Sequence, residues 1–186
     1  MKITKILLDT TYLLPLFEIK TEKFSKNDLK RLLKMNVELY YNPVSLIEIK
    51  WKIIKLCKRD RSKLKYIRKV YNETLEYLQT TDELIPTEII TKEISVLDDI
   101  LFDAGIRDFF DRIIVATAEI FTSVLLTEDE ELRDIPTKLD EFRDLLIISW
   151  NELQGDHERE EPKIIYIMHE LFETKLNVIH RMRGIS

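Results

Sequence analysis

Four acidic residues stand where an apolar segment ends or where a helix is expected to begin: Asp9, Glu48, Asp111 and Asp129. Asp9 directly follows three apolar residues, so its charge is drawn to the edge of the core, where an unpaired carboxylate is costly. Carboxylates that meet in one pocket repel one another and raise each other's pKa values, so the ionised cluster needs a cation. Mg²⁺ and Mn²⁺ prefer oxygen ligands, and one or two such ions can activate water and stabilise the departing oxygen of a phosphodiester. The set therefore indicates a metal-dependent nuclease.

Each acid taken singly also has a structural interpretation. Ser45 and Glu48 have the spacing of a capping box, in which Ser45 is the N-cap of a helix and Glu48 folds back onto a free backbone N–H. Residues 127–130 allow the same interpretation, and Asp108 can cap the helix whose third residue is Asp111. One such acid is more often a cap than a ligand. Four such acids in one chain make a shared metal site the better interpretation than four separate caps.

Composition limits the class of protein. The chain has 186 residues, of which 45% are hydrophobic, and this suits one compact domain with an appendage. The single cysteine, Cys57, excludes an internal disulfide, and no apolar run reaches the roughly 20 residues needed to cross a bilayer. We therefore expect no membrane association and a reducing, cytoplasmic location.

A basic segment follows the second acid. Residues 50–69 hold ten Lys and Arg against Asp60 alone, so they carry +9 and the rest of the chain −14 of the net −5. Such a segment can bind a phosphate backbone. Trp51 and Tyr66 within it, and Tyr71 just beyond it, can stack on bases. The expected RNA contacts are Lys50, Lys52, Lys55, Lys58, Arg59 and Arg61. The alternative is a solvated helix face without a ligand.

Apolar patterning predicts strands at residues 3–8, 37–41, 84–85, 123–126 and 145–149, and helices at 27–34, 45–58, 62–79, 87–102 and 108–121. The helices at 45–58 and 62–79 are expected to form an antiparallel pair. Alternation of strands and helices predicts an α/β fold of three layers, α/β/α, with a central parallel sheet. Ligands of such sheets bind at the carboxyl ends of strands, where Asp9 and Asp129 fall.

The end of the chain is expected to be separate from this fold. Residues 1–150 are predicted to form the catalytic domain, and residues 151–186 a linker followed by an amphipathic C-terminal helix at about 163–182. The apolar face of that helix is expected to pack on its own domain, and a dimer or partner contact is the alternative.

Other chemistries lack the residues they need. The three glycines are isolated, so there is no phosphate-binding loop. His157, His169 and His180 are too widely spaced to converge on one zinc ion, and one cysteine cannot complete such a site. Cys57 has no histidine nearby in the sequence to activate it as a nucleophile.

The four acidic motifs resemble those of the PIN-domain family, whose members include VapC-type toxins. The family begins with a strand ending in Asp and a small polar residue, as in Leu8-Asp9-Thr10-Thr11, and has a Glu near a helix start, as in Ser45-Leu46-Ile47-Glu48. Its third motif is similar to Asp108-Phe109-Phe110-Asp111-Arg112, and its fourth to Thr127-Glu128-Asp129. Thr11 replaces the more usual Asn or Ser, and Phe109 the common Pro. The four matches occur in family order and cover about residues 3–149.

The resemblance implies that Asp9, Glu48, Asp111 and Asp129 bind Mg²⁺ or Mn²⁺, with Thr11, Ser45 and Thr127 as supporting residues. It implies endoribonuclease cleavage of single-stranded RNA, a homodimer and, if the chain is a toxin, an antitoxin protein as partner. The chain is longer than a typical toxin, so an RNA-processing nuclease fits equally well. The alternative from another class is a PIN-like RNA-binding or assembly module that cuts little or nothing.

Overall fold

The computed structural model describes residues 4–59, 62 and 64–155. The chain divides into two compact units, Met1–Ile148 and Ser149–Ser186. No helix in the described part is long and apolar enough to span a membrane.

A five-stranded, all-parallel sheet lies at the centre of the first unit. Its strands are β1 (Thr4–Leu8), β2 (Val37–Tyr41), β3 (Ile85–Pro86), β4 (Val124–Leu126) and β5 (Leu146–Ile148), in the spatial order β3-β2-β1-β4-β5. Leu8 pairs with Tyr41 on one side and Leu126 on the other. The chain moves outward from β1 to β3 and then returns to β4, so the strand order reverses between β1 and β4. The carboxyl ends at such a reversal are where open α/β sheets bind ligands.

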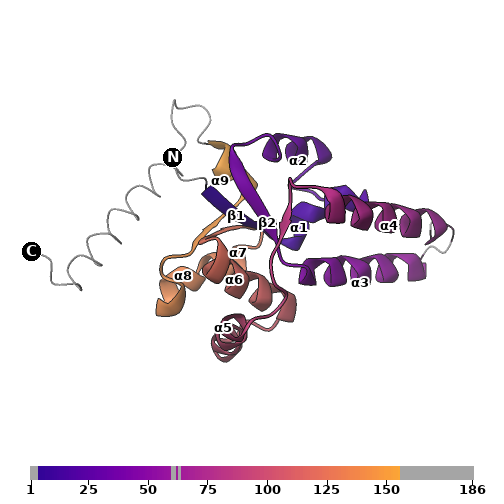
Figure 1. The fold of residues 1–186 in the computed structure, drawn as a ribbon. Helices are drawn as coiled ribbons and strands as arrows, with labels where there is room; N and C mark the ends of the chain where they lie inside the picture. Colours follow the sequence, from indigo (N-terminus) through magenta and orange to yellow (C-terminus); the bar gives the residue numbers. More distant parts are fainter. Residues whose placement is uncertain (1–3, 60–61, 63, 156–186) are drawn as a thin grey trace, which may run out of the picture. The chain divides into compact units, whose positions relative to one another are not determined.

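Helices flank this sheet (Figure 1). Between β1 and β2 lie α1, η1 and α2, between β2 and β3 lie α3 and α4, between β3 and β4 lie α5 and α6, and between β4 and β5 lie α7, α8 and η3. Their bounds are α1 Thr10–Leu13, η1 Leu14–Phe17, α2 Lys26–Leu32, α3 Val44–Arg59, α4 Leu64–Thr80, α5 Lys92–Asp103, α6 Phe109–Phe121, α7 Glu130–Arg133, α8 Ile135–Lys138 and η3 Asp140–Phe142. The α/β fold and the parallel sheet expected from the sequence are confirmed.

The core explains why β1 and β4 are continuous apolar runs rather than alternating ones. Residues 6–8 and 124–126 are at most 1% exposed, because helices cover both faces of a parallel sheet. The middle of α6 is buried as well, from Arg112 to Ala118. A rigid, fully packed centre therefore fixes the ends of β1, β4 and α6.

Asn42, rather than Ser45, caps α3. Its Oδ1 accepts a 2.8 Å hydrogen bond from the backbone N–H of Val44, the first residue of α3, and Pro43 between them has no N–H to satisfy. Ser45 lies within the helix. The capping box that was the alternative interpretation of Ser45 and Glu48 is therefore wrong, because the Ser45 N–H donates to the Asn42 carbonyl and the Ser45 hydroxyl has no partner among the described residues.

The start of α5 also differs from expectation. The helix begins at Lys92 and not at Thr87, and Thr91 is its cap, accepting a hydrogen bond from the Ile94 N–H. The carbonyls of Glu88 and Ile89 accept hydrogen bonds from the Asn42 side chain instead. The residues that the pattern placed in the first turn are thus bound to the end of β2.

The expected pair of helices after β2 is present. Figure 1 shows α3 and α4 side by side, and the Tyr71 hydroxyl on α4 donates a 3.1 Å hydrogen bond to the Leu46 carbonyl on α3. In the second unit the described helix is α9 (Trp150–Gly155), which Ser149 and Glu152 cap reciprocally. The predicted helix at 163–182 lies outside the described residues, and the division at residue 150 stays a prediction.

Candidate metal and nucleic-acid site

Asp9 is fixed at the carboxyl end of β1. Its backbone N–H donates a 3.1 Å hydrogen bond to the Leu126 carbonyl, so the residue is held at the junction with β4. The residue is only 8% exposed. Burial raises the pKa of Asp9 to about 6, and the negative charge of Glu48 adds to the effect, whereas hydrogen bonds from Thr127 and the Thr10 backbone lower it.

Thr127 connects Asp9 to Asp129. This fully buried residue follows β4, and its hydroxyl donates a 2.9 Å hydrogen bond to Asp9 Oδ2. The same oxygen accepts a 3.1 Å hydrogen bond from the Asp129 backbone N–H. Asp129 in turn caps α7, with Oδ1 accepting from the Glu131 N–H at 2.8 Å. One hydroxyl therefore sets the positions of two of the four acids.

Asp111 occupies the first turn of α6, and Asp108 caps that helix as expected. Asp108 Oδ1 accepts hydrogen bonds from the N–H groups of Phe110 and Asp111 at 2.8 and 3.4 Å. Burial, with the negative charge of Asp108 as the next cause, raises the pKa of Asp111 to about 7. The charges of the other three candidate acids act in the same direction. The other three candidate acids are thus near enough to Asp111 for their charges to raise its pKa.

Glu48 projects from the first turns of α3 and is bound to a lysine. Lys52 Nζ lies 2.6 Å from Glu48 Oε1, and the Glu48 side chain is 16% exposed. The positive charge of Lys52 also lowers the pKa of Asp9, so this lysine acts on two candidate ligands. Lys52 was expected to contact RNA, and its pairing with Glu48 was not anticipated.

The acids suit a divalent cation in chemistry but do not form a closed cage. Hard oxygen donors whose charges raise each other's pKa values are the ligands that Mg²⁺ or Mn²⁺ would neutralise. Among the described residues, however, no three His, Cys, Asp or Glu side chains are placed so that they could hold an ion as they stand. Ion binding would therefore require side-chain rotation, above all by Glu48, which Lys52 holds.

The other supporting residues are less engaged. Ser45 and Thr10 are buried, and within the described residues neither hydroxyl has a hydrogen-bond partner. Thr11 lies in α1 and is half-buried. Of the three residues expected to support the site, Thr127 alone contacts a candidate acid through a described hydrogen bond.

The basic residues of α3 divide between two sides of the helix. Lys52 and Lys55 follow Glu48 by four and seven residues and so share its face. Lys50 lies on the other side, with Nζ 4.0 Å from the centre of the Tyr71 ring on α4. Lys58 is exposed. The Arg59 side chain and Arg61 lie outside the described residues.

An exposed aromatic group adjoins the acids. Trp51 is 54% exposed, and its ring centre lies 6.5 Å from that of Phe110, the residue before Asp111. Lys55 Nζ lies 4.1 Å from the Trp51 ring centre. Tyr71 is only 8% exposed, and the Tyr66 hydroxyl binds Glu18. Of the three aromatic residues considered for stacking, Trp51 is the one that is both exposed and next to a site element.

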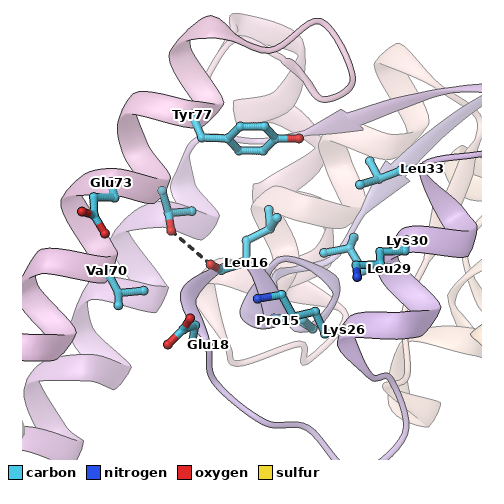
Figure 2. Close-up of a pocket in the computed structure, with 11 residues that line it drawn as sticks. Pro15, Leu16, Glu18, Lys26, Leu29, Lys30, Leu33, Val70, Glu73 and Tyr77 are labelled. Atoms are coloured by element: carbon cyan, nitrogen blue, oxygen red, sulfur yellow. Dashed lines mark hydrogen bonds between the residues drawn. The ribbon is translucent and has the colours of Figure 1, made fainter.

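A cavity of about 470 Å³ lies beside Asp111 and is lined by Arg107, Asp108 and Glu131 among others. Arg107 was missed by the motif analysis, although it directly precedes the Asp108–Asp111 motif in the sequence. A second cavity, of about 390 Å³, lies among η1, α2 and α4, where the Thr74 hydroxyl binds the Leu16 carbonyl (Figure 2). None of the four acids lines this second cavity.

A parallel sheet with carboxylates at the β1–β4 reversal defines an α/β protein with a candidate nuclease site. Residues 6–138 match the family model described as PIN domain. The chain therefore belongs to the PIN-domain family, a family of nucleases in general.

Solved structures agree on the fold. VapBC2 from Rickettsia felis, bound to a DNA fragment from its promoter, aligns with a TM-score of 0.52 at 18% identity, covering 79% of this chain and 99% of that one. A toxin–antitoxin complex from Klebsiella pneumoniae aligns with a TM-score of 0.50 at 17% identity, covering 78% and 97%. No curated protein matches the sequence.

Proposed function

We propose that this chain is a divalent-metal-dependent endoribonuclease that cleaves single-stranded RNA. Asp9, Glu48, Asp111 and Asp129 would hold Mg²⁺ or Mn²⁺, with Thr127 fixing Asp9 and Asp129. When bound, the ion supplies activation of water and neutralisation of the phosphate charge.

One observation carries the proposal: the carboxylates of all four motifs act on Asp111, whose pKa rises to about 7. Four acids drawn from β1, α3, α6 and the end of β4 have no structural need to meet, because each could be solvated separately. Their convergence destabilises the protein unless a cation or a proton compensates. A binding site for a cation explains why such an arrangement is retained.

The path of the substrate is inferred from α3. The side of α3 that carries Glu48 also carries Lys52, Lys55 and the exposed Trp51. An RNA strand could bind there through phosphate contacts to the lysines and base stacking on the tryptophan. Stacking requires unpaired bases, and this favours single-stranded RNA over a duplex. Lys50 faces α4 and is the weakest of the expected RNA contacts.

The biological role proposed is that of a toxin, assembled as a homodimer and inhibited by an antitoxin protein. Support comes from the fold, which is similar to that of structures described as VapBC2 and as a toxin–antitoxin complex. Growth arrest on expression, relieved by the product of a neighbouring gene, would support this role. Normal growth would favour an RNA-processing nuclease.

The activity is tested with end-labelled single-stranded RNA in Mg²⁺, Mn²⁺ or EDTA. The proposal predicts cleavage in the metals, none in EDTA, and losses of at least about a hundredfold in Asp9→Asn and Asp111→Asn. Asp82→Asn, an exposed acid remote in sequence from the motifs, serves as the matched control and should cleave normally. Circular dichroism verifies that each variant is folded.

The alternative function is a PIN-like RNA-binding or assembly module that cuts little or nothing. The absence of a preformed cage among the described residues is the observation that favours it. RNA binding without cleavage, together with no stabilisation by Mn²⁺, would establish this alternative and reject the nuclease.

A further inference from the structure

Lys52 occupies a position among the candidate ligands that a surface lysine does not need. Its ammonium lies 2.6 Å from Glu48 Oε1, so the two groups are in direct charge-assisted contact, at the short end of the distances usual for such pairs. Glu48 in turn carries one of the charges that act on Asp9 and Asp111. Lys52 is therefore a positive charge placed at the edge of the four-acid group.

The environment of Glu48 makes this cation consequential. The Glu48 side chain is 16% exposed and Asp9 is 8% exposed, so water screens their repulsion poorly. The Lys52 side chain is 44% exposed and has a long flexible stem, so its ammonium can move between the carboxylate and the solvent. Release of Lys52 would leave Glu48 free to rotate towards Asp9.

The position of Lys52 in the helix gives it a second use. It lies one turn beyond Glu48 on the same face as Lys55, between the acids and the rest of the basic segment. Lys52 contacts Glu48 directly, whereas Lys55 lies over the Trp51 ring, so a phosphate bound at the acids would be closer to Lys52 than to Lys55. The residue that neutralises Glu48 is thus also the first that a substrate strand would meet.

We propose that Lys52 is an internal counter-ion of the metal site. Its ammonium pairs with Glu48 when no divalent ion is bound, and pairs with a substrate phosphate instead when Glu48 ligates the ion. This inference rests on the proposed function. It makes Lys52 a positioning residue that opposes metal binding and favours RNA binding.

Opposite effects on the two ligands distinguish this role from a plain helix salt bridge. A lysine that only stabilises α3 would alter metal and RNA binding in the same direction, or neither. A lysine that competes with the ion for Glu48 must, on removal, strengthen metal binding while it weakens RNA binding.

The experiment compares Lys52→Met with Lys55→Met in the full chain. Mn²⁺ dissociation constants are measured by calorimetry without RNA, and KM and kcat for single-stranded RNA at saturating Mn²⁺. For Lys52→Met we expect Mn²⁺ binding tighter by roughly three- to tenfold, the range of a strong, partly exposed ion pair, and a raised KM. Lys55→Met removes the same charge one turn further on, so it should raise KM and leave Mn²⁺ binding within about twofold.

Mn²⁺ binding that is equal or weaker in Lys52→Met would overturn the counter-ion role, while the metal site itself would stand. No Mn²⁺ binding by the unsubstituted protein would instead reject the proposed metal site, and the role of Lys52 with it. Lys52→Arg is the third variant, and because it keeps the charge it should bind Mn²⁺ no more tightly than the unsubstituted protein.

Discussion

Thr127 Oγ1 donates a 2.9 Å hydrogen bond to Asp9 Oδ2 and so joins the residues that follow the two central strands, β1 and β4. The same hydroxyl accepts from the Asp129 N–H at 3.1 Å. Thr127 is fully buried, and its own backbone N–H donates to the carbonyl of Ile148, the last residue of β5. One residue that is not itself an acid therefore connects three neighbouring strand ends: its side chain binds Asp9 after β1, and its backbone joins β4 to β5.

Replacement of Thr127 by Val should weaken metal binding. The change keeps the shape of the side chain but removes the hydrogen bond that lowers the pKa of Asp9, and it leaves the Asp129 N–H without this partner. Loss of such an orienting group typically reduces metal affinity by about 10- to 100-fold. Calorimetric titration with Mn²⁺ measures the effect, and Thr127→Ser, which keeps the hydroxyl, should retain most of the affinity. Equal affinities for Val and Ser would show that the hydroxyl does not organise the site.

The metal-free protein should become less stable as pH rises from about 4 to 7. The pKa values of Asp9 and Asp111 in the folded protein, about 6 and about 7, lie above the ordinary value of 3.8, so the folded state keeps protons that the unfolded chain releases. The unfolding free energy must therefore fall with pH across this interval and level off above it. Asp111→Asn should make this fall in unfolding free energy smaller by about 1–3 kcal/mol. The range allows for solvent screening, because Asp111 is partly exposed.

Urea unfolding in EDTA at pH 5 and pH 8 tests this pH dependence. Asp111→Asn should raise the unfolding free energy at pH 8 relative to the unsubstituted protein, and the exposed Asp82→Asn should not. Addition of Mn²⁺ at pH 8 should stabilise the unsubstituted protein more than Asp111→Asn. If the unfolding free energy in EDTA instead rises between pH 5 and pH 8, and Asp111→Asn removes that rise, the carboxylates do not repel one another in the folded protein.

Trp51→Ala should weaken the binding of single-stranded RNA with little loss of protein stability. The ring is 54% exposed and stands next to Phe110, so it offers a stacking face beside the acids. Stacking contributes about 1–3 kcal/mol per base, which corresponds to roughly a 5- to 150-fold loss in affinity. Fluorescence anisotropy with labelled RNA in EDTA measures binding without cleavage, and Trp51→Phe should keep part of it. If Ala and Phe variants bind as tightly as the unsubstituted protein, the substrate does not pass over this ring.

Arg112→Met should destabilise the fold by about 2–4 kcal/mol, because it removes a buried guanidinium and leaves its partly buried partners unpaired. Arg112 Nε lies 2.6 Å from Asp98 Oδ1, and Nη1 donates to the carbonyls of Ile106 and Arg107 at 3.2 and 3.0 Å. These contacts bind α5 and the loop before Asp108 to the start of α6.

Urea unfolding at pH 7 gives the size of the Arg112 effect. Asp98→Asn keeps a hydrogen-bond acceptor and should lose less stability than Arg112→Met. An unchanged midpoint in Arg112→Met would mean that the loop and α5 are held by apolar packing alone.

Local patterning was sufficient for the framework of the fold. β2 occupies Val37–Tyr41 as predicted, and β1 and β4 lie within one residue of their predicted limits, because a buried parallel strand is a short apolar run bounded by polar residues. Asp108 caps α6 as its spacing suggested. The pattern also placed Asp9 and Asp129 at the carboxyl ends of two strands, and the structure shows that these strands are neighbours.

The starts of α3 and α5 show what local patterning lacked. Asn42 and Ser45 both suit an N-cap, as do Thr87 and Thr91, so the sequence near each helix offers two competing starts. The choice depends on Asn42, whose side-chain amide donates to the carbonyls of Glu88 and Ile89 and to the Thr117 hydroxyl, 46, 47 and 75 residues away. Contacts of that separation are not encoded in a local window.

The amino-acid pattern was enough to predict the strands, the longer helices and the residue types at the site, because these follow from periodic burial and from caps within a few residues. It did not predict the short helices α1, α7, α8 and α9. Only the tertiary structure decided that Lys52 binds Glu48, that Lys50 faces Tyr71 instead, and that Trp51 is exposed. The lysines of α3 are chemically alike. They differ in whether they face the acids, α4 or the solvent. That distinction arises from how the helices pack, since packing assigns each face of a helix to a neighbour.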